Sequence, residues 1–161
     1  MDKISIKTKL TEKDYIRFNL YQYYKSWQIK LLTIFGLVLL AGLLIFYLSG
    51  LTNFDYIFSL SFGVTITVLV PLMMIFNSKK NFKLNTQLQE EITYEFVNDL
   101  LLITGESFNA QLAIDKLFKL SFSKKWFLIY PSPQIVNIIP IHNINVEQIN
   151  YLKTKYPSIL K

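Results

Sequence analysis

Two long apolar runs dominate the hydrophobic pattern of the chain. Residues 31–48 (LLTIFGLVLLAGLLIFYL) and 56–76 (YIFSLSFGVTITVLVPLMMIF) contain no ionised side chain, and only residues 49–55 separate them. A helix of about 20 apolar residues spans a bilayer, and over that length only a helix satisfies its own backbone in lipid. Two buried helices of a soluble core would show polar faces at helical spacing, which residues 37–46 lack. The pattern therefore predicts two transmembrane helices, at 31–48 and 56–76, joined by an extracytoplasmic loop at 49–55.

The charges beside these runs predict their orientation. Lysines flank the pair of runs: Lys25 and Lys30 precede the first run, and Lys79, Lys80 and Lys83 follow the second. The loop carries only Asp55, so the positive-inside rule predicts two passes with both termini cytoplasmic, in a bacterial cytoplasmic membrane. Trp27, with Lys30, Lys79, Lys80 and Lys83, forms the expected membrane-anchoring flank, because aromatic and basic side chains favour the interface.

Small residues predict how the two helices pack. Ser59, Gly63 and Thr67 recur every four residues on the second run and would let another helix approach closely. The expected partner is the first run, through Gly36, Ala41 and Gly42, and a contact between two copies of the chain is the alternative. Pro71 is expected to kink the second helix. Neither run has an ionisable residue at its centre, which argues against a transporter or proton relay.

The N-terminal region changes period at residue 11. Ile4, Ile6, Thr8 and Leu10 alternate with polar residues, which predicts a strand with one buried face within residues 1–11. Thr11 and Asp14 resemble a helix-capping pair. Residues 12–30 are then predicted to form a juxtamembrane aromatic helix.

Beyond the second run the chain becomes polar and then β-rich. Residues 77–91 are predicted to form a helical stalk that continues the second run, or else a linker, and residues 92–161 a domain of short strands. The expected strands are 92–97, 100–104, 107–113, 117–122, 126–130 and 135–139, with Pro140 ending the last one and a helix at 146–156. Six strands leave one sheet edge exposed, which the N-terminal strand can fill. We therefore predict an α+β membrane protein in which the two-helix hairpin is inserted between the first and second strands of a seven-stranded, pleckstrin-homology-like domain with a C-terminal helix.

Several blocks of the sequence resemble the YcxB-like family of bacterial membrane proteins. They are LTEKDYIRFNLY before the first run, and ITYEF, ITGESF and KKWFLIYPSPQIVNIIP after the second. The chain departs from the family at AIDKL, where Ile114 stands in place of the usual tryptophan. The resemblance implies a pleckstrin-homology-like cytoplasmic domain on a membrane hairpin. The family has no settled activity, so the resemblance assigns no functional residue.

Composition leaves little room for catalysis. The 161 residues include no cysteine, one histidine, His142, and five glycines, without a phosphate-binding loop or a serine-nucleophile motif. Glu90 and Glu91 are adjacent and point to different faces, so they do not form a catalytic carboxylate pair. The net charge of +6 is spread along the chain, which makes nucleic acid a poor partner. We predict no enzyme activity and no catalytic, metal or cofactor site.

The best candidate for binding is the turn at Lys124, Lys125 and Trp126. Two cations beside an amphipathic ring can meet a lipid phosphate or an acidic peptide. The alternative is that the lysines are ordinary turn residues and Trp126 belongs to the core.

Two functional hypotheses follow. The first is a protein-interaction module that scaffolds or regulates a membrane complex, with an unidentified membrane or cytoplasmic protein seated between a sheet edge and the C-terminal helix. The second is a sensor of anionic lipid headgroups at the inner leaflet, which salt would weaken. A third, self-protection against a membrane-active peptide, has no residue to support it. The bilayer is a partner in each case, and a homo-oligomer is compatible with all three.

Overall fold

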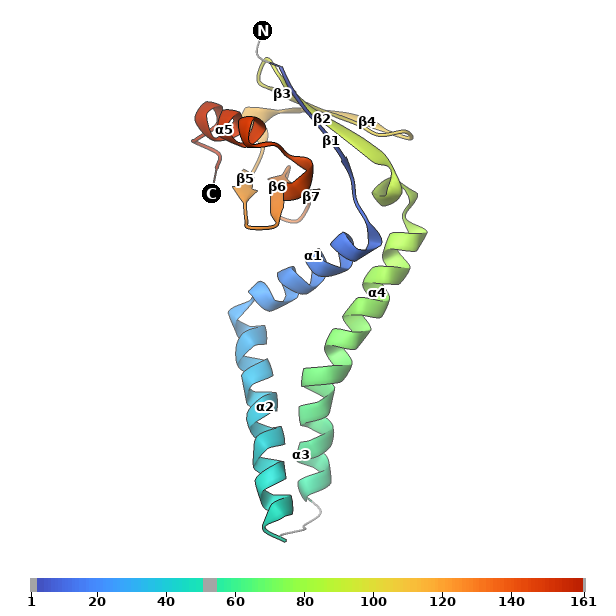
Figure 1. The fold of residues 1–161 in the computed structure, drawn as a ribbon, viewed down its shortest axis with the longest axis vertical. Helices are drawn as coiled ribbons and strands as arrows, with labels where there is room; N and C mark the ends of the chain where they lie inside the picture. The colour runs from blue at the N-terminus through green and yellow to red at the C-terminus, as the bar shows by residue number, and fades with distance from the viewer. Residues whose placement is uncertain (1–2, 51–54, 161) are drawn as a thin grey trace. The chain divides into compact units, whose positions relative to one another are not determined.

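The structure is a computed structural model that describes residues 3–50 and 55–160, with the side chains of 55–59 left out (Figure 1). It divides into two units. One unit combines Met1–Thr11 with Asn85–Lys161, and the other is Glu12–Leu84. The chain therefore leaves the first unit, forms the whole second unit, and returns.

Two antiparallel sheets build the first unit (Figure 1). The larger sheet has the order β1-β2-β3-β4 and the smaller one the order β5-β6-β7. The strands are β1 (Ile4–Lys9), β2 (Glu91–Val97), β3 (Leu100–Thr104), β4 (Asn109–Ala113), β5 (Lys119–Phe122), β6 (Trp126–Tyr130) and β7 (Asn137–Pro140), followed by helix α5 (Val146–Lys155). The short 3-10 turns are η2 (Thr86–Gln89), η3 (Ile114–Lys116) and η4 (Ile141–Asn143).

Three strands are shorter than predicted. The strand predicted at 107–113 begins only at Asn109, because residues 106–108 belong to the preceding turn. The strand predicted at 117–122 begins at Lys119, after η3. The strand predicted at 135–139 is β7, whose last residue is Pro140. Pro140 is therefore the last residue of the strand and not the residue after it, and an edge strand tolerates a proline.

Strand β1 pairs with β2 as the alternating pattern predicts. The register is antiparallel, with Ile6 opposite Tyr94 and Thr8 opposite Ile92. Ile6, Thr8 and Leu10 are buried, whereas the lysines between them are exposed. Asn143 Nδ2 donates a 2.7 Å hydrogen bond to Thr8 Oγ1, so the one polar residue on the buried face has a partner.

The core lies between the two sheets and α5. Its fully buried side chains include Phe96, Leu101, Phe127 and Leu152. The Phe96 ring lies 6.5 Å from the Phe127 ring, which joins the two sheets at the centre of the core. The residues of β6 are all buried, as expected for the central strand of its sheet.

The second unit is helical. It contains α1 (Glu12–Lys25), α2 (Trp27–Leu48), α3 (Asp55–Val64), the π-helical segment η1 (Thr65–Leu69) and α4 (Val70–Leu84). Two helices, Trp27–Leu48 and Leu60–Leu84, are long and apolar enough to cross a membrane. Most of the large apolar side chains of these two helices are not covered by other parts of the chain. Helices that face lipid have the same property.

Two predicted boundaries were wrong. The segment 12–30 is not one helix, because Ser26 is extended (ψ 128°) and separates α1 from α2. The stalk predicted at 77–91 is helical only to Leu84, because Asn85 is extended (ψ 99°) and η2 follows it. Propensity alone did not mark these ends, since neither site has a proline or glycine.

Helix α1 packs along α4. Tyr15 and Phe82 form a ring contact with centroids 5.9 Å apart. Asn19 Nδ2 donates a 3.1 Å hydrogen bond to the buried Ser78 Oγ. The aromatic residues of α1 thus serve partly in packing between helices.

The helix irregularity expected at Pro71 lies on its N-terminal side. The π-helical segment η1 ends at Leu69, and the Val70 N–H bonds the Thr65 carbonyl oxygen, five residues earlier. Pro71 has no N–H, and its ring would clash with the carbonyl four residues before it. A wider turn at that point relieves the clash without ending the helix.

Candidate functional site

The turn at 123–126 exposes two of the three predicted binding residues and buries the third. Ser123 N–H donates to the Trp126 carbonyl at 2.8 Å, and Trp126 N–H donates to Ser123 Oγ at 3.0 Å. Lys124 and Lys125 occupy the two central positions and are exposed, whereas Trp126 is only 3% exposed. The burial of Trp126 confirms the alternative, that its ring belongs to the core. The two lysines stand alone at the tip.

Replacing Trp126 with alanine is expected to destabilise the domain by about 3–5 kcal/mol, the usual loss when a buried large aromatic side chain is removed. Lys125→Ala, one residue earlier, should change stability by less than about 0.5 kcal/mol because it is exposed. Denaturant unfolding of the two variants measures both values. Similar losses in the two variants would contradict the inward position of Trp126.

The β5 edge of the smaller sheet is already paired. Leu120 on β5 donates its N–H to the Ile159 carbonyl oxygen at 2.8 Å, and Leu120 forms a parallel bridge with Leu160. Ile159 and Leu160 therefore pair with the β5 edge of the smaller sheet. Sequence reasoning missed this pairing because Ile159 and Leu160 follow a helix and are too few to show strand periodicity.

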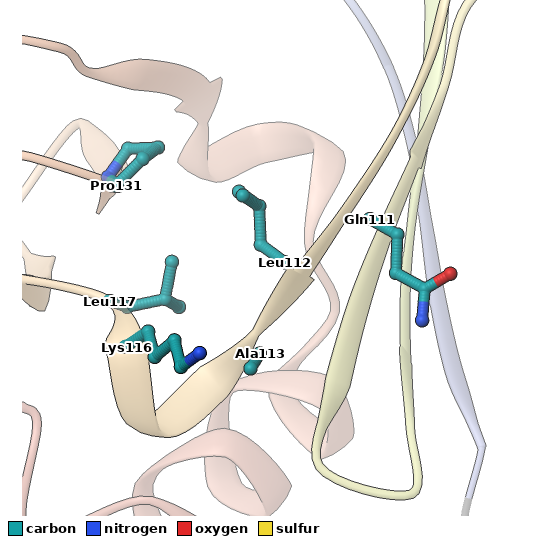
Figure 2. A pocket seen from close by; sticks show the side chains of 6 residues that line it. All are labelled: Gln111, Leu112, Ala113, Lys116, Leu117 and Pro131. Atoms are coloured by element: carbon teal, nitrogen blue, oxygen red, sulfur yellow. The ribbon is translucent and has the colours of Figure 1, made fainter.

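A pocket of about 250 Å³ lies at the other sheet, beside strand β4. Its lining comes from β4, η3 and the turn after β6: Gln111, Leu112, Ala113, Lys116, Leu117 and Pro131. Figure 2 shows the Leu112, Leu117 and Pro131 side chains around one space, with Gln111 turned away from it. The pocket thus has apolar walls and one cation, Lys116. Only the fold brings these segments together, so the sequence could not reveal the pocket.

Glu90 holds the turn that leads into β4. Its Oε1 accepts a 2.6 Å hydrogen bond from Ser107 Oγ, and its Oε2 accepts one of 2.9 Å from Ser107 N–H. These bonds lower the pKa of the Glu90 carboxyl group, because they favour its charged form. Glu90 is therefore a structural partner of Ser107.

The lowered pKa of Glu90 predicts an acid-sensitive turn. A carboxyl group whose pKa is lower in the folded state stabilises that state at high pH, and the stabilisation disappears as pH falls through the folded pKa. Glu90→Gln should therefore melt below the wild type at neutral pH, and the difference should shrink in acid. Melting temperatures against pH, with the exposed Glu147→Gln as control, test this. A constant difference would contradict it.

Two other predicted groups can now be placed. His142 is exposed on η4, and among the side chains that the structure describes no three of His, Cys, Asp or Glu gather where they could hold a metal ion. The expected membrane flank is exposed: Trp27 and Lys30 on α2, and Lys79, Lys80 and Lys83 on α4. Lys79 also lies 3.7 Å from a Glu12 carboxylate oxygen, so it helps to join α1 to α4.

The residues predicted at the helix contact behave differently from one another. A Cβ atom on Gly36 would lie 2.8 Å from Thr67 Cγ2, and one on Gly63 would lie 3.3 Å from the Gly36 carbonyl oxygen. These three residues form the close approach of α2 to α3 and η1. A Cβ atom on Gly42 would meet nothing within 4 Å and Ala41 is exposed, so the predicted contact does not extend to them. The side chain of Ser59 lies outside the described residues.

The chain therefore belongs to the α+β class, with two long apolar helices and two small antiparallel sheets. Comparison with protein families, with curated proteins and with solved structures finds no match for it.

Proposed function

We propose that this chain is a non-catalytic integral membrane protein that presents its β domain as an interaction module on the cytoplasmic face of a bacterial membrane. In this proposal α2 and the helix from α3 to α4 cross the bilayer twice, and both termini are cytoplasmic. The domain is of the pleckstrin-homology-like type, as the YcxB-like resemblance implies. Its role is to scaffold or regulate a membrane complex.

The observation that carries this proposal is the pairing of β1 with β2 across the helical insertion. The chain passes from β1 into α1 and comes back from α4, through η2, into the neighbouring strand. The domain is therefore joined to the helical unit by two chain connections, at neighbouring strands of one sheet. A small domain held in this way at a membrane suits the display of a binding surface.

Cysteine labelling tests the membrane topology. The chain has no cysteine, so single cysteines at Gly50 and at Lys125 give unambiguous signals. In intact cells a membrane-impermeant maleimide should label the cysteine at position 50 and leave the one at 125 unlabelled until the membrane is permeabilised. Labelling of position 125 in intact cells would overturn the orientation.

Photocrosslinking tests the interaction role. A photoreactive residue is placed in turn at exposed positions on different parts of the domain: Ser5, Gln111, Lys124 and Glu147. The full-length protein is irradiated in the cell that makes it. A discrete protein adduct at some positions and not at others is expected. Absence of adducts at all four would overturn the interaction proposal.

A second candidate, a sensor of anionic lipid, is supported by the two exposed lysines at the tip of the β5–β6 turn. Each basic side chain near an anionic surface contributes about 1 kcal/mol. Full-length protein in neutral nanodiscs should then bind anionic vesicles, lose that binding at high salt, and lose it in a Lys124→Glu, Lys125→Glu variant. Binding unaffected by either change would overturn the lipid hypothesis.

A further inference from the structure

The two sheets have four edge strands among the described residues, and three of them are protected. An unprotected edge exposes backbone N–H and C=O groups that pair readily with another chain. On β1, Gln148 Nε2 donates a 2.8 Å hydrogen bond to the outward Ser5 carbonyl oxygen. The exposed Lys7 and Lys9 add charge to the same edge. Edge lysines are a common defence against pairing.

The second sheet is protected at both edges by other means. On β5 the N–H of Leu120 is bonded to Ile159, as described above. On β7 the register places Pro140 opposite Trp126, and the Ile141 N–H bonds the Lys125 carbonyl oxygen. Hydrogen-bonded pairs alternate along an antiparallel ladder, so Pro140 occupies an outward position. Proline has no N–H to offer there.

Strand β4 has none of these protections. Its five residues, NAQLA, include no lysine and no proline. Gly105 N–H bonds the Phe108 carbonyl oxygen at 2.9 Å, and Ile114 N–H bonds the Asp99 carbonyl oxygen at 2.9 Å. These two pairs lie in the same register as the β3–β4 ladder. Residues 108, 110, 112 and 114 therefore face β3, and the backbone groups of Asn109 and Gln111 face outward.

The pocket lies beside this open edge. Leu112 is both a residue of β4 and a wall of the pocket. In a strand added to β4, the residue opposite Leu112 would direct its side chain to the face of the sheet that carries Leu112. Apolar cavities of about 150 Å³ admit a molecule as large as benzene. A pocket of about 250 Å³ therefore has room for an apolar side chain. Lys116, in the same lining, favours an acidic neighbour on the added strand.

We infer that β4 is a docking edge for an extended segment of a partner protein, which adds as a fifth strand, places an aliphatic or aromatic side chain in the pocket, and carries an acidic residue near Lys116. Backbone hydrogen bonds to Asn109 and Gln111 supply affinity, and the pocket supplies specificity. Lys116, which lies in the pocket lining, is the ground for the acidic residue. This inference rests on the proposed role as an interaction module and names its surface.

The test uses full-length protein in nanodiscs and a library of random peptides displayed on phage. Enriched peptides should combine one large apolar residue with at least one acidic residue. Gln111→Pro removes an outward N–H and leaves the hydrogen bonds to β3 in place. It should lower the affinity for these peptides about tenfold, because one hydrogen bond is lost and the edge is blocked. Ser5→Pro makes the same change on the protected β1 edge and should leave binding unchanged.

Two further variants keep the test decisive if proline disturbs the fold. Gln111→Lys adds the usual edge protection at an exposed position and should weaken binding while the melting temperature stays near that of the wild type. Lys116→Glu should reduce binding of the acidic peptides and favour basic ones. Equal binding of the enriched peptides to wild type, Gln111→Lys and Lys116→Glu would overturn the inference, and so would a library that yields no peptide.

Other outcomes separate this inference from the proposed function. Crosslinked partners at Lys124 or Glu147, with no peptide bound at β4, would overturn the docking edge and leave the interaction role standing. Peptides bound at β4, with no crosslinked partner in cells, would overturn the interaction role. Light scattering of the wild type and Gln111→Lys detects a second copy as the occupant. A change in oligomeric state between them would overturn a partner segment in favour of self-pairing.

Discussion

Residues 85–161 without the N-terminal strand are expected to show no cooperative unfolding transition, and a flexible link to residues 1–11 is expected to restore one. Removing β1 uncovers the edge of β2, where six of its seven residues pair with the first strand. It also removes Ile6, which is 0% exposed, from the centre of the core. A domain this small has only about 5–15 kcal/mol of stability, so the loss of an entire strand should exceed it.

A matched pair of single substitutions tests the same prediction in the full-length chain. Ile6→Ala should destabilise the domain by about 2–5 kcal/mol, because the cavity lies in a packed core. Lys7→Ala, on the opposite face of the same strand, should have an effect below about 0.5 kcal/mol. Limited proteolysis of both variants in detergent measures the difference. A stable, cooperatively melting fragment 85–161 would contradict the role assigned to β1.

Local patterns in the sequence predicted the elements that have a strong period. The two-residue alternation from Ile4 to Leu10 predicted both β1 and its buried face, and the two apolar runs predicted the long helices. Asn98 and Asp99 predicted a hairpin turn, and both have the positive φ angles (48° and 59°) that such turns use. In each case the signal lies within a few neighbouring residues.

Features that depend on distant contacts were missed or left open. The sequence allowed two roles for Trp126, a ligand contact and a core residue, and its position in the central strand of a sheet decides for the core. Ile159 and Leu160 gave no strand signal, because their pairing depends on where β5 lies. The pocket beside β4 needs the stretch 111–117 and the distant Pro131 to come together. The residues NAQLA identify an unprotected edge only once the strand order shows that β4 is an edge strand.

The close contact between the two long helices gives the second large expected effect. Gly36→Leu should disrupt the packing of α2 on α3 and η1, because the space for a Cβ atom is already taken by Thr67 Cγ2 at 2.8 Å. Overpacking of this kind typically destabilises by about 1–3 kcal/mol. A Cβ atom at Gly42, on the same helix, would meet no atom within 4 Å, so Gly42→Leu should be tolerated. Unfolding of each full-length variant in a detergent titration gives the comparison.

A designed disulfide tests the same contact directly. A Cβ atom at position 36 would lie 3.6 Å from Ile66 Cβ, within the about 3.5–4.5 Å typical of disulfides. Thr67→Ser removes the obstructing Cγ2 and keeps the hydroxyl that donates to the Gly63 carbonyl oxygen at 2.7 Å. The triple variant Gly36→Cys, Ile66→Cys, Thr67→Ser should therefore form an intramolecular disulfide under mild oxidation.

The control is the same variant with the first cysteine moved to Gly42, where no atom of the neighbouring helix lies within 4 Å. Because the natural chain has no cysteine, every crosslink comes from the designed pair. An intramolecular disulfide that forms efficiently from position 36 and not from position 42 would show that the face of α2 carrying Gly36 packs within one chain. Disulfide-linked dimers from the 36 variant would instead assign that face to contacts between two copies, and they would contradict the hairpin packing described above. Since Gly63 and Thr67 both border Gly36, this one result decides between the two contacts that the small residues of the second helix permit.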